Sequence, residues 1–146
     1  MTIYTIGFTK KSANKFFNLI KQNHVKKIID VRLNNVSQLA GFAKRDDLKF
    51  FLREICNCDY EHVPDLAPTD EILKPYKKGD IPWDSYKDLF LNLMARRNIE
   101  KLISLQQFEN ECLLCSENLP HQCHRRLVIE YLQQYAEQNH VIKDIF

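Results

Sequence analysis

Hydrophobic and polar positions along the chain fall into two kinds of segment, and each kind predicts a different element. Short runs of β-branched, aromatic and other apolar residues predict strands at residues 2–7, 25–33, 59–64, 111–117 and 140–146. Segments that gather apolar residues on one helical face predict helices at residues 12–22, 46–55, 82–97, 98–108 and 123–138. In the second strand Ile28, Ile29 and Val31 are nearly contiguous, which suits a parallel strand buried on both faces.

This alternation of strands and helices predicts an α/β fold. We expect a three-layer sandwich in which helices flank a mainly parallel central sheet of about five strands. The chain has 3 glycines and 5 prolines, with no internal repeat and no Gly/Ser-rich linker. Residues 1–146 are therefore expected to form one domain.

Polar residues follow three of the predicted strands. Parallel sheets bind ligands in the crevice beyond the carboxyl ends of their strands, and neighbouring strand ends would face one such crevice. The candidate ligand-binding residues after the first two strands are Gly7, Thr9, Asp30, Arg32 and, in the following loop, Ser37. Arg32 can bind an anion through two parallel hydrogen bonds, or it can be held by a carboxylate such as Asp30.

The late segment ECLLCSENLPHQCHRRLVIEYL concentrates cysteine, histidine and arginine. Side chains alternate along a strand, so Cys112 and Cys115 are predicted to point to opposite faces, which weakens the case for a zinc knuckle. A structural zinc site built on Cys115, Cys123 and either His121 or His124 stays an alternative. The favoured interpretation includes no metal and no cofactor. The five cysteines are an odd number, so a disulfide framework is not expected.

The helix start near Cys123 is a candidate anion site, because helix N-termini carry free N–H groups and a partial positive charge. Arg125 adds charge there, and Glu117 can pair with it internally instead of a ligand. A thiol at such a place is activated, because the dipole and nearby cations stabilise its thiolate. The predicted catalytic residues are Cys115 or Cys123 as nucleophile, His124 as proton carrier and Glu117 as orienting carboxylate, with Arg32 and Arg125 binding the anion.

Composition and charge narrow the classes of protein. Hydrophobic residues make up 45% of the chain and charged residues 27%, which is typical of a folded globular protein. The formal net charge of +2 is too small for a nucleic-acid footprint, although a local basic patch is compatible with it. The chain begins with a strand-like run rather than a signal region, and no apolar run is long enough to span a bilayer. We therefore expect a cytoplasmic protein without a membrane partner.

Four short motifs give the chain a family resemblance. They are T-I-G at residues 5–7, D-V-R at residues 30–32 followed by Ser37, L-C-x-E at residues 114–117, and C-H-R at residues 123–125. Together they resemble the domain of unknown function numbered 488, over nearly the whole chain. The resemblance implies an α/β fold and a cluster of polar motifs, but it implies no particular reaction.

The chain departs from the commonest form of that family at three places. Phe8 and Thr9 stand where many members have histidine and serine, so the chain has no catalytic histidine there. Gln38 replaces an arginine, and the segment at residues 66–69 replaces an L-G-G-R turn. These differences indicate a distinct branch whose ligand can differ from that of other members.

Three functions are compatible with the sequence. The first is a small α/β enzyme or ligand-binding domain for an anionic small molecule, nucleotide-like or phosphate-bearing. The second is a nucleic-acid-associated module that processes or senses modified bases, with phosphate contacts from Lys44, Arg45, Lys49, Arg53, Arg96 and Arg97. The third is the structural zinc domain.

Overall fold

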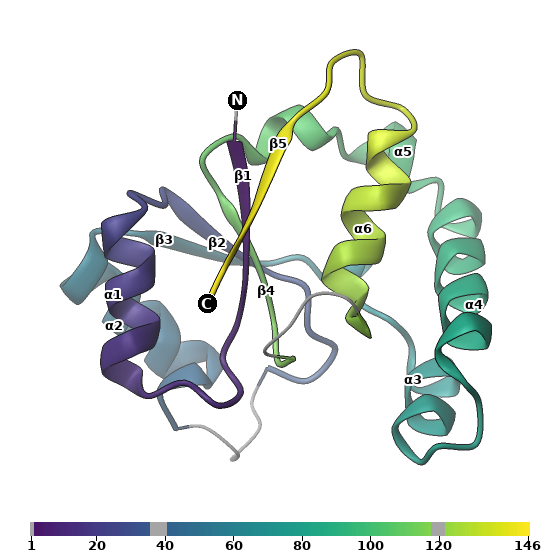
Figure 1. Ribbon diagram of the computed structural model, residues 1–146, viewed down its shortest axis with the longest axis horizontal. Coiled ribbons are helices and arrows are strands. Elements are labelled where there is room, and N and C mark those ends of the chain that lie inside the picture. The colour runs from purple at the N-terminus through teal and green to yellow at the C-terminus, as the bar shows by residue number, and fades with distance from the viewer. Residues whose placement is uncertain (1, 36–40, 118–121) are drawn as a thin grey trace.

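The computed structural model describes residues 2–35, 41–117 and 122–146. Its centre is a five-stranded sheet in which every pairing between neighbouring strands is parallel. In chain order the strands are β1 (Thr2–Gly7), β2 (Lys27–Asp30), β3 (Asp59–His62), β4 (Cys112–Cys115) and β5 (Val141–Ile145). In space they follow the order β3-β2-β4-β1-β5 (Figure 1). The predicted parallel α/β sheet is confirmed.

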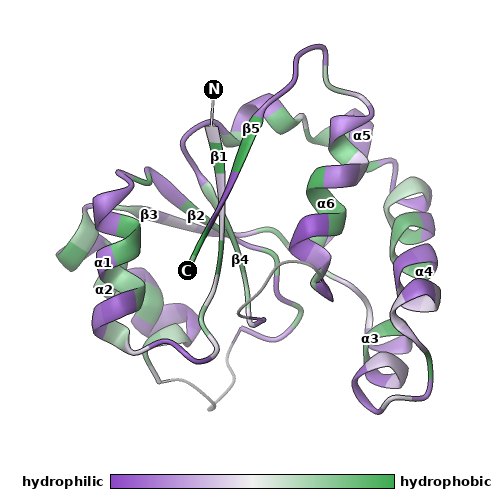
Figure 2. Ribbon diagram, viewed as in Figure 1, coloured by the Kyte–Doolittle hydropathy of each residue, from purple (hydrophilic) through white to green (hydrophobic). Residues whose placement is uncertain are grey.

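Helices cover both faces of the sheet, as predicted (Figure 1). One face carries α1 (Ala13–Gln22) and α2 (Arg45–Cys56). The other face carries α3 (Asp70–Lys77), α4 (Trp83–Arg96), α5 (Ile99–Leu102) and α6 (His124–Gln133). Short 3-10 turns lie at Gly41–Ala43, Pro64–Leu66 and Leu105–Phe108. In Figure 2 the helices are hydrophobic along part of their surface and hydrophilic along the rest, as helices on a sheet should be.

Two hydrophobic cores form because neighbouring residues of a strand point to opposite faces. Ile28 and Leu114 belong to the core beneath α1 and α2. The next residue of β2, Ile29, and the preceding residue of β4, Leu113, belong to the core beneath α4 and α6. All four side chains are almost completely buried, so each strand contributes to both cores. This explains the nearly continuous apolar runs in the sequence.

The same alternation separates two cysteines of β4. Cys112 lies in the core beneath α1 and α2, whereas Cys115 lies in the core beneath α4 and α6. The prediction that they point to opposite faces is confirmed, and the two do not act as a C-x-x-C knuckle.

The strand order brings the three chemically loaded strand ends together. β4 lies between β1 and β2, so Gly7 pairs with Cys115 and Asp30 pairs with Leu114 at one edge of the sheet. Neighbouring parallel strands with their carboxyl ends at one edge are the usual setting of a ligand site in α/β proteins. None of the helices in the described part of the chain is long and apolar enough to cross a membrane.

Candidate functional site

A cavity of about 630 Å³ opens beyond this edge of the sheet. Its aromatic wall is made by Phe8, Tyr76 and Tyr86, and its basic residues are Arg32, Lys74, Lys77 and Lys78. Residues on either side of the β4–α6 connection also line it, namely Ser116, Glu117, Gln122, Cys123 and His124. The remaining lining residues are Leu33, Asn34, Asp70 and Leu73. The volume lies in the range of small-molecule sites, which typically combine apolar walls with a few polar groups.

Arg32 is a buried member of the wall and is held by Asp30. The guanidinium donates from Nε to Oδ1 and from Nη2 to Oδ2 of Asp30, both at 2.8 Å. The hydroxyl of Tyr60 also donates to Oδ2, and the ring of Phe8 lies 5.3 Å from the guanidinium carbon. Of the two roles considered for Arg32, the clamp by Asp30 is therefore present. Arg32 nevertheless belongs to the wall of the cavity, although it is buried.

Two histidines fix the backbone that carries Arg32. Nε2 of His62 lies 2.8 Å from the carbonyl of Arg32, and Nε2 of His124 lies 2.6 Å from the carbonyl of Val31. A carbonyl only accepts, so Nε2 carries the proton in both rings. Burial lowers the pKa of His124 to about 4, so this ring is neutral near pH 7 and is a weak base. The proton-carrier role of His124 stays a prediction, whereas its positioning role is visible in the structure.

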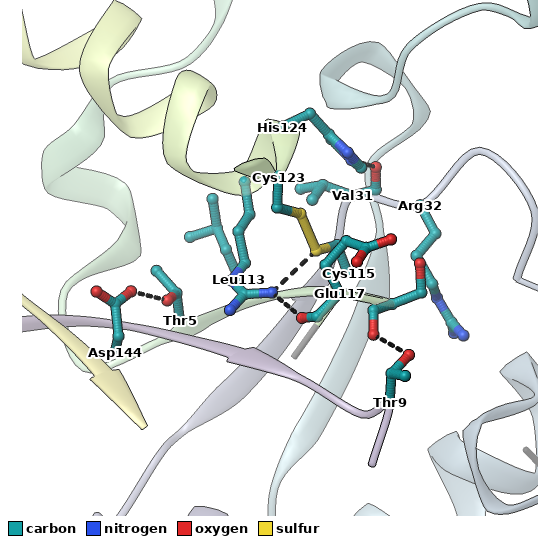
Figure 3. Close-up of a disulfide and its surroundings, with 12 residues drawn as sticks. Thr5, Thr9, Val31, Arg32, Leu113, Cys115, Glu117, Cys123, His124 and Asp144 are labelled. Carbon is teal, nitrogen blue, oxygen red and sulfur yellow. Dashed lines mark hydrogen bonds between the residues drawn. A yellow bond between two sulfur atoms is a disulfide. The ribbon is translucent and has the colours of Figure 1, made fainter. Parts of the chain in front are cut away.

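Cys115 and Cys123 are joined by a disulfide (Figure 3). Cys115 ends β4, and Cys123 is the N-cap residue of α6, so the bond links the sheet to the helix that follows it. Both side chains are buried, but only Cys123 belongs to the wall of the cavity. The odd number of cysteines led us to expect no disulfide framework, and this expectation is wrong for Cys115 and Cys123. Five cysteines leave room for one bonded pair beside three free thiols.

Arg125 is completely buried and is directed toward Cys115 rather than into the cavity. Its Nη1 lies 3.0 Å from the sulfur of Cys115 and 2.5 Å from the main-chain carbonyl of Glu117. Burial lowers the pKa of Arg125, and the nearby charge of Asp144 opposes this effect. Thr5 donates a hydrogen bond to that carboxylate (Figure 3). The structure therefore separates the two arginines that were predicted to bind one anion together.

Glu117 meets Arg125 through its carbonyl, and its carboxylate is turned the other way. Oε1 of Glu117 forms an ion pair with Nζ of Lys77 at 2.7 Å, on the exposed rim of the cavity. The internal Glu117–Arg125 contact considered from the sequence is present in this main-chain form. The carboxylate stands beside the cavity, where a ligand that binds Lys77 would compete with it.

Gly7 and Thr9 shape the site from β1 without lining the cavity. A side-chain carbon on Gly7 would stand 1.5 Å from the carbonyl oxygen of Glu117 and 2.9 Å from Nη1 of Arg125, so only glycine permits this approach. The backbone and hydroxyl of Thr9 both donate to the carbonyl of Ser116. These residues hold the ends of β1 and β4 together.

The sequence interpretation missed the contribution of α3. Lys74, Lys77 and Lys78 and the ring of Tyr76 all line the cavity. Their signal was the run KPYKK, which concentrates three lysines around one aromatic residue. Lys11 does not line the cavity, but it lies near Arg125. Burial and the charge of Arg125 lower the pKa of its ammonium to about 8. Ser37 and His121 lie outside the described residues.

The two rival functions gain no support from this geometry. Lys44, Arg45, Lys49 and Arg53 belong to α2 or precede it, whereas Arg96 and Arg97 end α4 on the opposite face of the sheet. The two groups therefore do not form one basic patch. In the described ranges no group of three or more histidine, cysteine, aspartate or glutamate side chains is placed to hold a metal ion. Both alternatives stay predictions without a structural feature behind them.

The fold and the cavity define a parallel α/β protein with a basic and aromatic pocket beyond its strand ends. The chain matches the family model described as "Domain of unknown function DUF488" over residues 12–132, and it belongs to that family. No curated protein and no solved structure matches the chain. The family resemblance drawn from the four motifs is confirmed, and it assigns no activity.

Proposed function

We propose that this chain is a cytoplasmic α/β enzyme or ligand-binding domain, acting as one domain, that takes an anionic small molecule into the cavity. The ligand class is nucleotide-like or phosphate-bearing. The observation that carries the proposal is the composition of the wall, where Arg32 and three lysines of the α3 segment stand beside three aromatic rings. A molecule with a charged group and a flat apolar part would satisfy both.

The lysines are the exposed part of the proposed anion site. Lys77 is paired with Glu117 and Lys74 with Asp70, and all four side chains are at least 47% exposed. Exposed pairs of this kind contribute little to stability, about 0–1 kcal/mol, so a phosphate can replace the carboxylates at small cost. Arg32 is the fixed part, since Asp30 and Phe8 hold its guanidinium in one orientation.

The aromatic residues supply a surface for a base or another flat group. Tyr76 and Tyr86 stack with their ring centroids 4.6 Å apart, and Tyr86 is almost completely buried. The cluster is held by its own packing, so the Tyr76 side chain that lines the cavity is held in place before a ligand binds. Base stacking on such rings is tolerant of base identity, which agrees with a ligand class rather than one ligand.

Covalent catalysis by a cysteine belongs to the proposal as its chemical part. Cys123 is the cysteine of the pair that lines the cavity, and the sulfur of Cys115 contacts Arg125. In the reduced protein Cys123 would be the nucleophile that a bound ligand meets first. The roles of Glu117 and His124 as orienting carboxylate and proton carrier are predictions of this proposal.

Calorimetric titration with inorganic phosphate, AMP and ATP tests the anion site. We expect the double variant Lys77→Ala/Lys78→Ala to bind these probes about tenfold more weakly, which corresponds to about 1.4 kcal/mol. Lys101→Ala is the matched control, because Lys101 is an exposed lysine on α5 and does not line the cavity. Equal binding by parent and double variant, or no binding of any probe, would contradict the proposal.

A further inference from the structure

The paired cysteines occupy a particular place relative to the cavity. Cys123 lines the cavity, while its partner Cys115 lies on the buried side with its sulfur 3.0 Å from Nη1 of Arg125. One residue of the pair therefore belongs to the cavity wall, and the sulfur of the other faces a buried cation. This asymmetry is what a disulfide needs in order to be opened from one side.

We propose that Cys115 and Cys123 are a redox-active pair that exchanges with a low-molecular-weight anionic thiol or disulfide bound in the cavity. The inference rests on the proposed function for its anion site and adds a reaction class to it. The substrate class is a small thiol that carries carboxylate groups, together with its disulfide.

The exchange balances in two steps. The thiolate of the first small thiol attacks the sulfur of Cys123, the bond between Cys123 and Cys115 breaks, and Cys115 leaves as a thiolate. A second small thiolate then attacks the substrate sulfur of the mixed disulfide, and Cys123 leaves and takes up a proton. The small thiols are oxidised to their disulfide, and the protein pair is reduced to the dithiol. The reverse sequence oxidises the protein at the expense of a small disulfide.

Arg125 makes Cys115 the better leaving sulfur. A guanidinium in contact with a sulfur stabilises the thiolate over the thiol, and thiol exchange is faster when the departing thiolate is more stable. Gly7 is a condition for this contact, because any side chain there would meet Arg125 and the carbonyl of Glu117. Burial keeps both groups away from water, which strengthens their attraction.

The remaining cysteines provide the contrast. Cys56, Cys58 and Cys112 are free, and burial raises the pKa of each of their thiols, to about 12 for Cys58. None of them lines the cavity. The sequence offers five cysteines, but the structure places only Cys123 at the cavity with a sulfur partner behind it.

The lysines at the cavity explain why an anionic thiol is favoured. Lys77 and Lys78 share the cavity wall with Cys123, so the carboxylates of a small peptide thiol would be attracted while its sulfur approaches Cys123. Glutathione and its disulfide are suitable probes of this chemistry. Hydroxyethyl disulfide is the uncharged counterpart.

Thiol alkylation in a series of glutathione redox buffers gives the first test. Quenching under denaturing conditions should show 3 reactive cysteines in the oxidised protein and 5 in the reduced one, with a reversible change between them. The variant Cys56→Ser should show the same reversible change, with one reactive cysteine fewer in both the oxidised and the reduced protein. A count that stays constant across the series would overturn the proposal.

The variant Cys115→Ser gives the second test, because it stops the reaction at the mixed disulfide. Treated with glutathione disulfide, it should gain one glutathionyl group at Cys123, found by peptide mapping. Modification of Cys56, Cys58 or Cys112 instead, or none at all, would overturn the assignment. Circular dichroism of the variant before treatment establishes that it is folded.

Charge selectivity separates this inference from the proposed function. Lys77→Ala/Lys78→Ala in the Cys115→Ser background should react about tenfold more slowly with glutathione disulfide and unchanged with hydroxyethyl disulfide. Equal slowing with both probes overturns the inference. If AMP binding is lost in the lysine variant while exchange shows no charge selectivity, the anion site stands and the thiol substrate falls. If AMP never binds but selectivity is present, the proposed nucleotide-like ligand falls and the anionic thiol stands.

Discussion

Arg32 and Arg125 look equivalent in the sequence, because Arg32 follows β2 and Arg125 lies in the first turn of α6, at the same edge of the sheet. The structure gives them different partners. Arg32 is held by the carboxylate of Asp30 and lines the cavity. Arg125 is completely buried and contacts a cysteine sulfur and a carbonyl. A carboxylate partner keeps its negative charge near neutral pH, so it holds the arginine in one orientation. A sulfur partner ties it to a group whose charge depends on its redox state. In the functions that we propose, the Arg32 side therefore contributes to ligand binding and the Arg125 side to sulfur exchange.

Removal of the charge on Asp30 should have the largest effect on stability. In Asp30→Asn the buried Arg32 loses its counter-charge, and we expect the free energy of unfolding to fall by about 3–5 kcal/mol. Urea denaturation measures it. Asp59→Asn is the control, because it breaks the Arg53 ion pair, in which both side chains are 67% exposed, and should cost less than about 1 kcal/mol. Similar losses in the two variants would mean that the buried Asp30–Arg32 pair stabilises the fold no more than an exposed ion pair does.

A methyl group on Gly7 would clash with the groups around Arg125. The substitution Gly7→Ala forces the carbonyl of Glu117 and the guanidinium of Arg125 away from β1, and we expect a loss of about 3 kcal/mol. Gly41→Ala is a matched control, because no atom of the described residues lies within 4 Å of the new carbon, and thermal unfolding should change little. A tolerated Gly7→Ala would show that Arg125 does not need its present place.

Lower pH should weaken the contact between α6 and β2 through His124. Burial lowers the pKa of His124 from 6.5 to about 4, so between these values the unfolded chain binds a proton that the folded chain does not. The contribution of neutral His124 to the free energy of unfolding is complete above pH 6.5, and it is lost as the pH falls toward 4. Because residue His124 as a whole is partly exposed, we expect the loss of stability to be about 1–3 kcal/mol.

The variant His124→Gln isolates this titration. It keeps a donor for the carbonyl of Val31 but cannot be protonated, so the difference in unfolding free energy between parent and variant should narrow from pH 7 to pH 4. A difference that is constant with pH would rule out the buried histidine as the cause.

Loss of Lys77 should have the smallest effect on stability. Its ion pair with Glu117 is about half exposed, and Lys77→Ala should change the free energy of unfolding by less than about 1 kcal/mol. Equilibrium unfolding measures it, with Lys101→Ala beside it. A larger loss would mean that the rim of the cavity is part of the structural framework, and the binding experiments would need the milder variant Lys77→Gln.

Much of this comparison depends on features that local sequence patterns cannot contain. The five strands and the opposite faces of Cys112 and Cys115 follow from period and alternation and were predicted correctly. The single helix expected at residues 98–108 is wrong, because the structure divides this segment into α5 and a 3-10 turn. The convergence of three strand ends required the strand order, which only tertiary packing decides. That Cys115 meets Cys123, and that Arg125 turns inward, depends on how α6 lies on the sheet.

Only part of the cavity wall could be predicted from the sequence. The strand ends identified one side of it, including Arg32, Glu117, Cys123 and His124. The opposite side comes from α3, whose lysines look like ordinary solvated residues until the helix is placed against the sheet edge. A site assembled from segments far apart in the chain is visible in sequence only segment by segment.

If the cavity is an anion site with Cys123 on its wall, AMP and glutathione disulfide should compete for it. The rate at which Cys115→Ser reacts with glutathione disulfide can be measured at increasing AMP concentration. We expect AMP to slow the modification of Cys123 in a saturable way, because both molecules would use Lys77 and Lys78. A rate that does not change at AMP concentrations up to the millimolar range would contradict it.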